Sequence, residues 1–108
     1  MIIPLATFKE YLQNMGKYIN ELVVLSHYDD NKQLDGLLLA KVPETSEAYK
    51  RGLREGDIVT SIQDVPITDT SVVGKVGWQL LDNEDYIVNV VITRNGEEEV
   101  LTYEIWPE

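Results

Sequence analysis

Cysteine is absent from the 108 residues, so the chain has no disulfide framework and no thiolate metal site. Histidine occurs once, as His27, beside Ser26 in a predicted strand. Adjacent strand residues point to opposite faces, so this pair does not work as a nucleophile and its base. The glycines are isolated, which excludes a phosphate-cradling loop. We therefore expect no catalysis, no cofactor and no metal site.

Long apolar runs are also missing from the sequence. The longest fall far short of the roughly 20 residues that a membrane helix needs, so we expect no membrane insertion by this chain. Residues Met1 to Pro4 carry no basic region and do not make a complete signal peptide. We expect the chain to be either cytosolic or a fragment of a longer protein.

Positive charge is scarce, because nine Lys and Arg residues stand against nineteen Asp and Glu residues, for a net charge of −10. Such a chain is repelled by the phosphates of nucleic acid and by an anionic membrane surface. A charged partner should be basic. A solvated acidic surface without a partner explains the same composition more simply.

What the chain does have is enough apolar sequence, 44%, for one globular domain. At the N-terminus, Thr7 and Glu10 have the spacing of a capping box and predict a helix from about Phe8 to Asn20. Its apolar stripe should pack on the domain or on another chain. The stripe consists of Phe8, Leu12, Met15, Ile19 and Leu22.

The stretch from Asp35 to Ile62 organises the rest of the chain. An apolar run, Leu37 to Val42, predicts a strand, and Leu22 to Val42 as a whole predicts a hairpin with a polar turn at Asp29 to Lys32. A short helix should follow, capped by Thr45 or Ser46 and ended by Gly52 in the left-handed conformation. After a turn containing Gly56-Asp57, a strand is predicted at Ile58 to Ile62.

The C-terminal third predicts one helix and one hairpin. Valines and leucines at helical spacing indicate a helix over Ser71 to Leu81, in which Gly74 and Gly77 should allow softness or close approach. The alternating segment Tyr86 to Arg94 predicts a strand. Asn95-Gly96 then predicts a type I′ turn into a returning strand.

The order of these elements resembles the PDZ domain as bacteria build it. The residues that carry the resemblance are Gly36, the strand Leu37 to Lys41, the helix Ser46 to Arg51, Gly52-Leu53 and Gly56-Asp57. The resemblance implies an α+β fold: a small, partly open antiparallel β-barrel or sandwich of five to six strands with two helices, plus an N-terminal helix. Residues 1–21 would form a helical extension and residues 22–108 the PDZ-like domain.

This resemblance implies a module that binds a peptide as an added strand and has no catalytic activity. The accepting strand would be Leu37 to Lys41, at a free edge beside the helix Ser71 to Leu81. A loop that holds the terminal carboxylate of a ligand would be formed by Leu34, Asp35, Gly36 and Leu37. Pocket walls would come from Leu37, Leu39, Val72, Val73, Val76 and Leu80, with Leu38 on the accepting edge. Each apolar residue of this set also fits ordinary core packing.

The charge of Asp35 would oppose a ligand carboxylate in that loop, so an internal or basic segment is expected rather than a free C-terminus. The layout also resembles the periplasmic PDZ domain of type II secretion system protein C, which implies protein transport on the periplasmic side of a bacterial inner membrane. A cytoplasmic location stays open. One alternative is a regulatory PDZ domain of an envelope serine or metallo-protease. Another is a self-associating module, for example a homodimer, whose groove is filled by its own N-terminal helix or tail.

Overall fold

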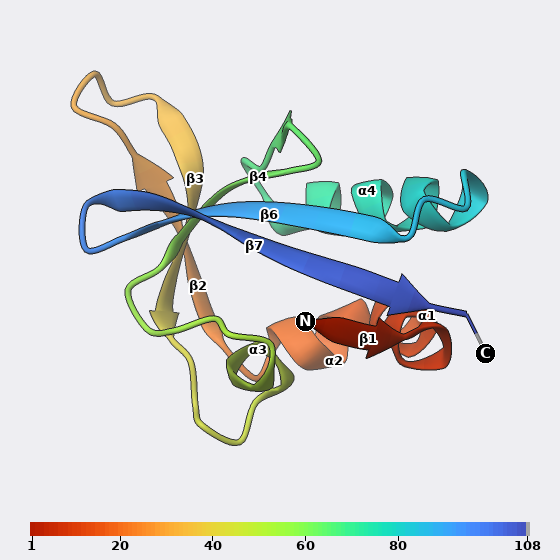
Figure 1. Cartoon of the computed structure of the whole chain (residues 1–108). Coiled ribbons are helices and arrows are strands. Elements are labelled where there is room, and N and C mark those ends of the chain that lie inside the picture. Colours follow the sequence, from red (N-terminus) through yellow and green to blue (C-terminus); the bar gives the residue numbers. More distant parts are fainter. Residues whose placement is uncertain (108) are drawn as a thin grey trace.

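The computed structural model, which describes residues 1–107, consists of one curled seven-stranded sheet and four helices (Figure 1). The strands are β1 (Ile2–Pro4), β2 (Val23–Tyr28), β3 (Leu34–Lys41), β4 (Ile58–Ile62), β5 (Val65–Pro66), β6 (Ile87–Arg94) and β7 (Glu97–Trp106). The helices are α1 (Leu5–Gln13), α2 (Met15–Ile19), α3 (Glu47–Lys50) and α4 (Thr70–Asp82). The strand order is β1-β7-β6-β4-β3-β2, and β5 pairs with β4.

The helices α1 and α4 contact each other beside the curled sheet. In Figure 1, β6 and β7 run across the molecule, whereas β2 and β3 stand steeply against them. In the same view α4 lies above β6, and α1 and α2 lie below β7. No helix within residues 1–107 is both long and apolar enough to cross a membrane.

Both predicted hairpins are confirmed. In the turn between β6 and β7, Asn95 and Gly96 have φ angles of 54° and 78°, as a type I′ turn requires. In the turn between β2 and β3, Asp29 Oδ1 accepts hydrogen bonds from the backbone N–H groups of Asn31 at 2.8 Å and Gln33 at 3.0 Å. An aspartate side chain that bonds the backbone two residues ahead is a common way to close such a turn.

The corner that joins β3 to β4 also follows the sequence. Ser46 caps α3 by accepting a hydrogen bond from the N–H of Tyr49, and Gly52 has a φ of +94°. Asp57, which is 1% exposed, accepts hydrogen bonds from Arg94 Nε at 2.8 Å and Arg94 Nη2 at 2.7 Å. This two-point ion pair ties the Gly-Asp turn to the end of β6.

The N-terminal segment differs from the prediction. The helix begins at Leu5 with Pro4 at its N-cap, so Thr7 lies inside α1 and caps nothing. A break at Asn14, with φ −120° and ψ 33°, separates α1 from α2. The unpredicted strand β1 pairs in parallel with β7, and this distant partner outweighs the local capping pattern. Pro4 ends β1, because proline has no N–H for the ladder.

The hydrophobic core lies between the inner face of the sheet and the helices. Ile3 of β1 is 6% exposed and belongs to the same buried cluster as residues from β3, β4, α4, β6 and β7. Leu5, Phe8 and Tyr11 of the N-terminal segment pack against the same cluster. The other members of the cluster are Leu37, Leu39, Val42, Val59, Ile62, Ile67, Val76, Leu80, Val88, Ile92, Tyr103 and Ile105.

Candidate functional site

The strand predicted to accept a partner, Leu37 to Lys41, is an interior strand. Leu38 of β3 pairs with Leu25 of β2 on one side and with Ile58 of β4 on the other. The expected free edge beside Leu38 is thus filled by the chain's own strands, and that prediction is wrong. The sequence predicted the hairpin of β2 and β3. It did not predict that β4 pairs with β3 and thereby leaves β2 at the edge.

The predicted carboxylate-binding loop, Leu34 to Leu37, is the first half of β3 rather than a loop. A Cβ on Gly36 would lie 2.5 Å from the carbonyl oxygen of Val59. Glycine is therefore needed here because β4 approaches closely, and not because a ligand does. Asp35 Oδ1 lies 2.6 Å from His27 Nδ1 of the neighbouring strand.

The sheet has two edge strands, β1 and β2, and β2 contributes Val24 to the cavity described below. This strand ends the sheet order, and its sequence Val-Val-Leu-Ser-His-Tyr contains no Lys, Glu or Pro to discourage pairing. Val23, Leu25 and Tyr28 are exposed, whereas the side chain of Val24 points inward and packs against the core. An unprotected edge of this kind is a ready template for an added strand.

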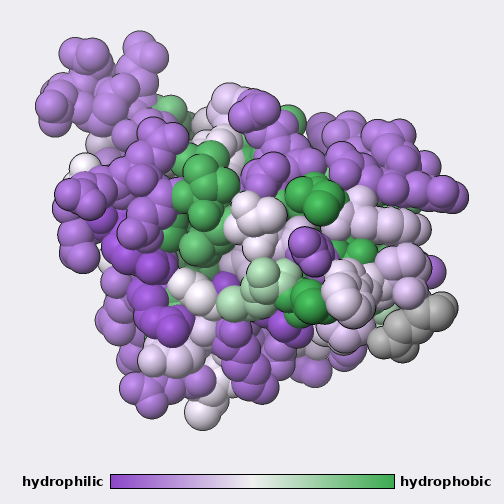
Figure 2. Space-filling model, in the orientation of Figure 1, coloured by the Kyte–Doolittle hydropathy of each residue, from purple (hydrophilic) through white to green (hydrophobic). Residues whose placement is uncertain are grey.

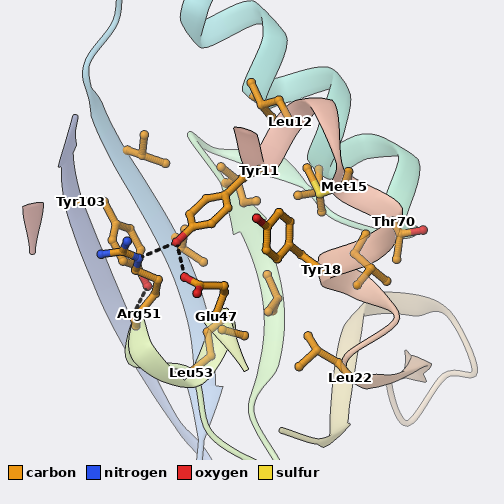
Figure 3. Close-up of a pocket in the computed structure, with 18 of the residues that line it drawn as sticks. Tyr11, Leu12, Met15, Tyr18, Leu22, Glu47, Arg51, Leu53, Thr70 and Tyr103 are labelled. Atoms are coloured by element: carbon orange, nitrogen blue, oxygen red, sulfur yellow. Dashed lines mark hydrogen bonds between the residues drawn. The ribbon is translucent and has the colours of Figure 1, made fainter. Parts of the chain in front are cut away.

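An apolar cavity of about 270 Å³ lies between β2, α4 and the inner face of the sheet (Figure 3). Val24 lines it from β2, and Val73, Gly77 and Leu80 line it from α4. Its other lining residues are Ile3, Phe8, Tyr11, Leu12, Met15, Tyr18, Ile19, Leu22, Leu37, Leu39, Glu47, Ala48, Arg51, Leu53, Val59, Ile62, Thr70, Val88, Val90 and Tyr103.

The cavity brings together only part of the predicted pocket, namely Leu37, Leu39, Val73 and Leu80. Val76 is 4% exposed and sits in the core cluster, and Val72 also lies outside the cavity lining. A Val76→Lys substitution would bury a charged group in the core. It would therefore disrupt the fold and would not selectively block a groove. The remaining predicted site residues, which lie on β3 and do not line the cavity, are Leu34, Asp35, Gly36 and Leu38.

The helix α4 begins one residue before the predicted range and ends one residue after it. Asp69 caps it by accepting a hydrogen bond from the N–H of Ser71 at 2.8 Å. Hydrogen bonds from the side chain and the backbone of Ser71 lower the pKa of Asp69. The cap fixes the start of the helix, and thereby places Thr70 and Val73 at the cavity.

The N-terminal helices supply a side of the cavity that sequence reasoning did not include in the site. Figure 3 shows Leu12 beside α4, with Met15 and Tyr18 along the cavity and Leu22 where the chain enters β2. Leu12 is buried, whereas Met15, Tyr18 and Ile19 are half-buried. The apolar stripe at helical spacing was the signal for these residues.

A small polar cluster closes one end of the cavity (Figure 3). The hydroxyl of Tyr11 donates to Glu47 Oε2 at 2.7 Å and accepts from Arg51 Nε at 3.0 Å. This hydrogen bond from Tyr11 is the main reason that the pKa of Glu47 is lowered, and burial is the main reason that the pKa of Tyr11 is raised. Tyr103 donates to the carbonyl of Arg51. The polar atoms thus satisfy one another and leave the cavity apolar.

The arrangement is suited to binding an extended chain. A free strand edge supplies backbone donors and acceptors, and the apolar cavity beside it can receive side chains. Figure 2 shows one face of the molecule as mostly hydrophilic, with separate apolar patches among hydrophilic residues. Within residues 1–107, no three His, Asp or Glu side chains lie in a cluster that could hold a metal ion.

Solved structures with similar folds identify the fold. The PDZ domain of EpsC from Vibrio cholerae matches with a TM-score of 0.58 and 15% identity, over 92% of this chain and 91% of that one. The PDZ domain of HtrA3, bound to a phage-derived ligand, matches with a TM-score of 0.55 and 12% identity, over 78% and 80% of the two chains. The chain has the PDZ fold.

The HtrA-type protease AlgW with a decapeptide also matches, with a TM-score of 0.50 and 20% identity, over 91% of this chain and 34% of that longer chain. No protein-family model matches the sequence, and no curated protein is significantly similar to it. The predicted α+β class with the PDZ-like fold and an N-terminal helix is confirmed, although the sheet has seven strands instead of five or six.

Proposed function

We propose that this PDZ-fold domain is a non-catalytic binding module that takes up an extended segment of a partner protein along β2. The observation that carries the proposal is the free edge of β2 directly beside an apolar cavity bounded by α4. Strand addition supplies main-chain hydrogen bonds, and the cavity supplies side-chain selection. The HtrA3 PDZ domain was solved with a phage-derived ligand, which supports a peptide as the bound species.

The partner segment should be basic. Three exposed carboxylates are neighbours of lining residues, by a hydrogen bond or in the sequence: Glu10 accepts from the lining Tyr18, while Glu21 and Asp69 immediately precede the lining residues Leu22 and Thr70 in the chain. Within the described part of the chain, none of the three forms an ion pair with Lys, Arg or His. Together with the net charge of −10, they favour a cationic segment and faster association at low salt.

Selection from a random peptide library, with free and with amidated C-termini, tests the proposal. Val24→Ala should weaken every selected peptide, because Val24 lines the cavity from β2. The matched control is Val100→Ala on β7, where the valine is 57% exposed and lies away from the cavity. Equal binding by the two variants would place the site elsewhere. Loss of binding on amidation would show that a terminal carboxylate is read.

We further propose that the domain belongs to a type II secretion assembly on the periplasmic side of a bacterial inner membrane, where it serves protein transport. The match to the EpsC PDZ domain over nearly the full length of both chains supports this assignment. A regulatory PDZ domain of an envelope protease is the second candidate, supported by the match to AlgW. The complete gene separates the two: one membrane helix upstream favours secretion, and a protease domain favours the alternative.

A self-associating module is the third candidate, because the exposed residues Val23, Leu25 and Tyr28 give β2 an edge that a second copy can also use. Light scattering over a range of concentrations tests this role. A dimer that disappears on substitution of Leu25 by lysine would support it. A monomer at every concentration would exclude obligate self-association.

A further inference from the structure

The helix α2 presents apolar side chains to the cavity without filling it. Met15, Tyr18 and Ile19 all line the cavity and are half-buried. Among the described residues, these three do not belong to the set packed against the core cluster, whereas Phe8, Tyr11 and Leu22 do. Figure 3 shows Met15 and Tyr18 on the cavity side of the N-terminal helices. At this wall of the cavity, Met15 and Ile19 are therefore apolar side chains outside the packed core. Tyr18 differs from them, because its ring contacts Tyr11 and its hydroxyl donates to Glu10.

The size and chemistry of the cavity define what fits. Its volume of about 270 Å³ exceeds the roughly 150 Å³ of a dry apolar cavity that binds benzene. The charged groups at its end, Glu47 and Arg51, are already bonded through Tyr11. Within residues 1–107, no buried side-chain nitrogen or oxygen is left without a hydrogen-bond partner. A charged or strongly polar group entering the cavity would lose its hydration without compensation.

We propose that α1 and α2 form a third wall of the binding groove, and that Met15 and Ile19 select a large uncharged side chain, aromatic or long aliphatic, from the partner. The proposal rests on the proposed function, because the partner must lie along β2 for its side chain to reach α2. The N-terminal segment is then part of the binding site and not a tether. The carboxylates of Glu10, Glu21 and Asp69 around the lining favour basic residues on either side of the inserted side chain.

The same carboxylates argue against an acidic lipid or fatty acid as the occupant. An anionic head group bound here would be repelled by Glu10, which bonds to the lining Tyr18, and by the chain as a whole, whose net charge is −10. A cationic peptide segment with one bulky apolar residue satisfies both the cavity and its rim.

Peptides recovered from the library provide the first test. For each peptide, an analogue is made in which the largest apolar residue is replaced by alanine. The affinity of the peptide and of its analogue is then measured for the wild type, Met15→Ala and Ile19→Ala. We expect roughly tenfold weaker binding for the analogue, as for other apolar groups removed from a pocket, and a comparable loss for each variant. Ile87→Ala is the control, since Ile87 on β6 is 48% exposed and lies outside the cavity lining. The variants should also bind the alanine analogue about as well as the wild type does, because the side chain they recognise is gone.

The outcomes separate this inference from the function on which it rests. If Val24→Ala weakens the peptides but Met15→Ala and Ile19→Ala do not, the third wall is wrong and binding along β2 stands. If none of the three weakens them, both proposals fail. If the alanine analogues bind as well as their parents, the cavity does not select a bulky side chain.

Indole, used as a small apolar probe, tests the cavity without a peptide, first in the wild-type chain and then in two tryptophan variants. Methyl NMR of the wild-type chain should show shifts for Met15, Ile19 and Val73, with little change at Val100 on β7. Val73→Trp should fill the cavity and abolish the indole shifts, whereas Val100→Trp should preserve them. An absence of shifts at Met15 and Ile19 in the wild type would overturn the proposal.

Discussion

Leu12 of α1 lies against the backbone of Gly77 in α4, so closely that any side chain at position 77 would collide with it. Both residues are buried and both line the cavity. The contact joins the N-terminal helices to the helix that bounds the cavity. Glycine at position 77 therefore serves close packing, which was one of the two interpretations open from the sequence.

Alanine substitutions at the two glycines of α4 should act in opposite directions. Gly74→Ala should stabilise the fold by up to about 1 kcal/mol, because alanine favours a helix and nothing lies within 4 Å of the added methyl. Gly77→Ala should destabilise it by about 1–3 kcal/mol, because Leu12 must move. Urea unfolding measures both changes. Stabilisation by both would mean that α1 does not pack on α4 in solution.

A double-mutant cycle tests the contact itself. Leu12→Ala alone should cost about 2–3 kcal/mol, since a buried leucine leaves a void. In Leu12→Ala with Gly77→Ala, the methyl at position 77 occupies space that Leu12 vacates, so the double variant should be more stable than the sum of the single effects predicts. Strict additivity would contradict a direct contact.

Gly36→Ala should weaken the pairing of β3 with β4. The added methyl would lie 2.5 Å from the carbonyl oxygen of Val59, and a backbone atom in a sheet cannot move aside as a side-chain end can. We expect a loss of about 1–3 kcal/mol in the free energy of unfolding. Gly16→Ala is the control, because nothing lies within 4 Å of position 16. Wild-type stability of Gly36→Ala would show that the two strands are further apart.

The ion pair between Asp57 and Arg94 should contribute far more to the free energy of unfolding than the ion pair between Glu99 and the same arginine. Asp57→Asn removes a charge that is 1% exposed, so we expect a loss of about 3–5 kcal/mol. Glu99 lies 3.4 Å from Arg94 but is 47% exposed, and Glu99→Gln should cost less than about 1 kcal/mol. Thermal unfolding of the two variants provides the comparison, and similar losses would contradict the assignment of the buried pair as the main support.

Tyr11→Phe should raise the pKa of Glu47 toward its ordinary value of 4.5, because the hydrogen bond from Tyr11 is the main cause of the lowered value. A lowered pKa in the folded state contributes stability above pH 4.5, and this contribution is lost as the pH falls through the folded pKa. The variant should therefore lose less stability on acidification than the wild type does.

NMR titration of the Glu47 carboxyl carbon gives the pKa directly. Tyr18→Phe is the control, since the hydroxyl of Tyr18 donates to Glu10 at 2.9 Å and not to Glu47. An unchanged Glu47 pKa in Tyr11→Phe would show that the link between α1 and α3 does not form in solution.

Local signals in the sequence were sufficient for much of the fold. Ser46 caps α3, Asn95-Gly96 turns the last hairpin, and β4 has the predicted bounds, because each depends on backbone preferences and partners within a few residues. The prediction that Thr7 caps the first helix was wrong, because the start of α1 depends on a partner far away in the sequence. Pairing of Ile2 and Ile3 with β7, about a hundred residues away, fixes where α1 begins.

The candidate site was only partly accessible from the sequence. Leu37, Leu39, Val73 and Leu80 were assigned to the pocket and do line the cavity, because inward apolar positions follow from periodicity. The same periodicity placed Val76 in the pocket, although its side chain packs into the core. A stripe of apolar residues shows that a face is buried, but the neighbouring elements determine whether core or cavity covers each position.

By itself, the sequence determined a chain that is acidic and without cysteine, with two hairpins, a capped corner and the order of elements found in PDZ domains. Only the tertiary structure decided that β2 and not β3 is an edge strand, and that the N-terminal helices line the cavity. Both hairpin strands are equally apolar, so nothing local distinguishes them. A strand lies at the edge of a sheet when one of its sides has no pairing strand. Here β2 is an edge because β4, about twenty residues further along the chain, pairs with β3.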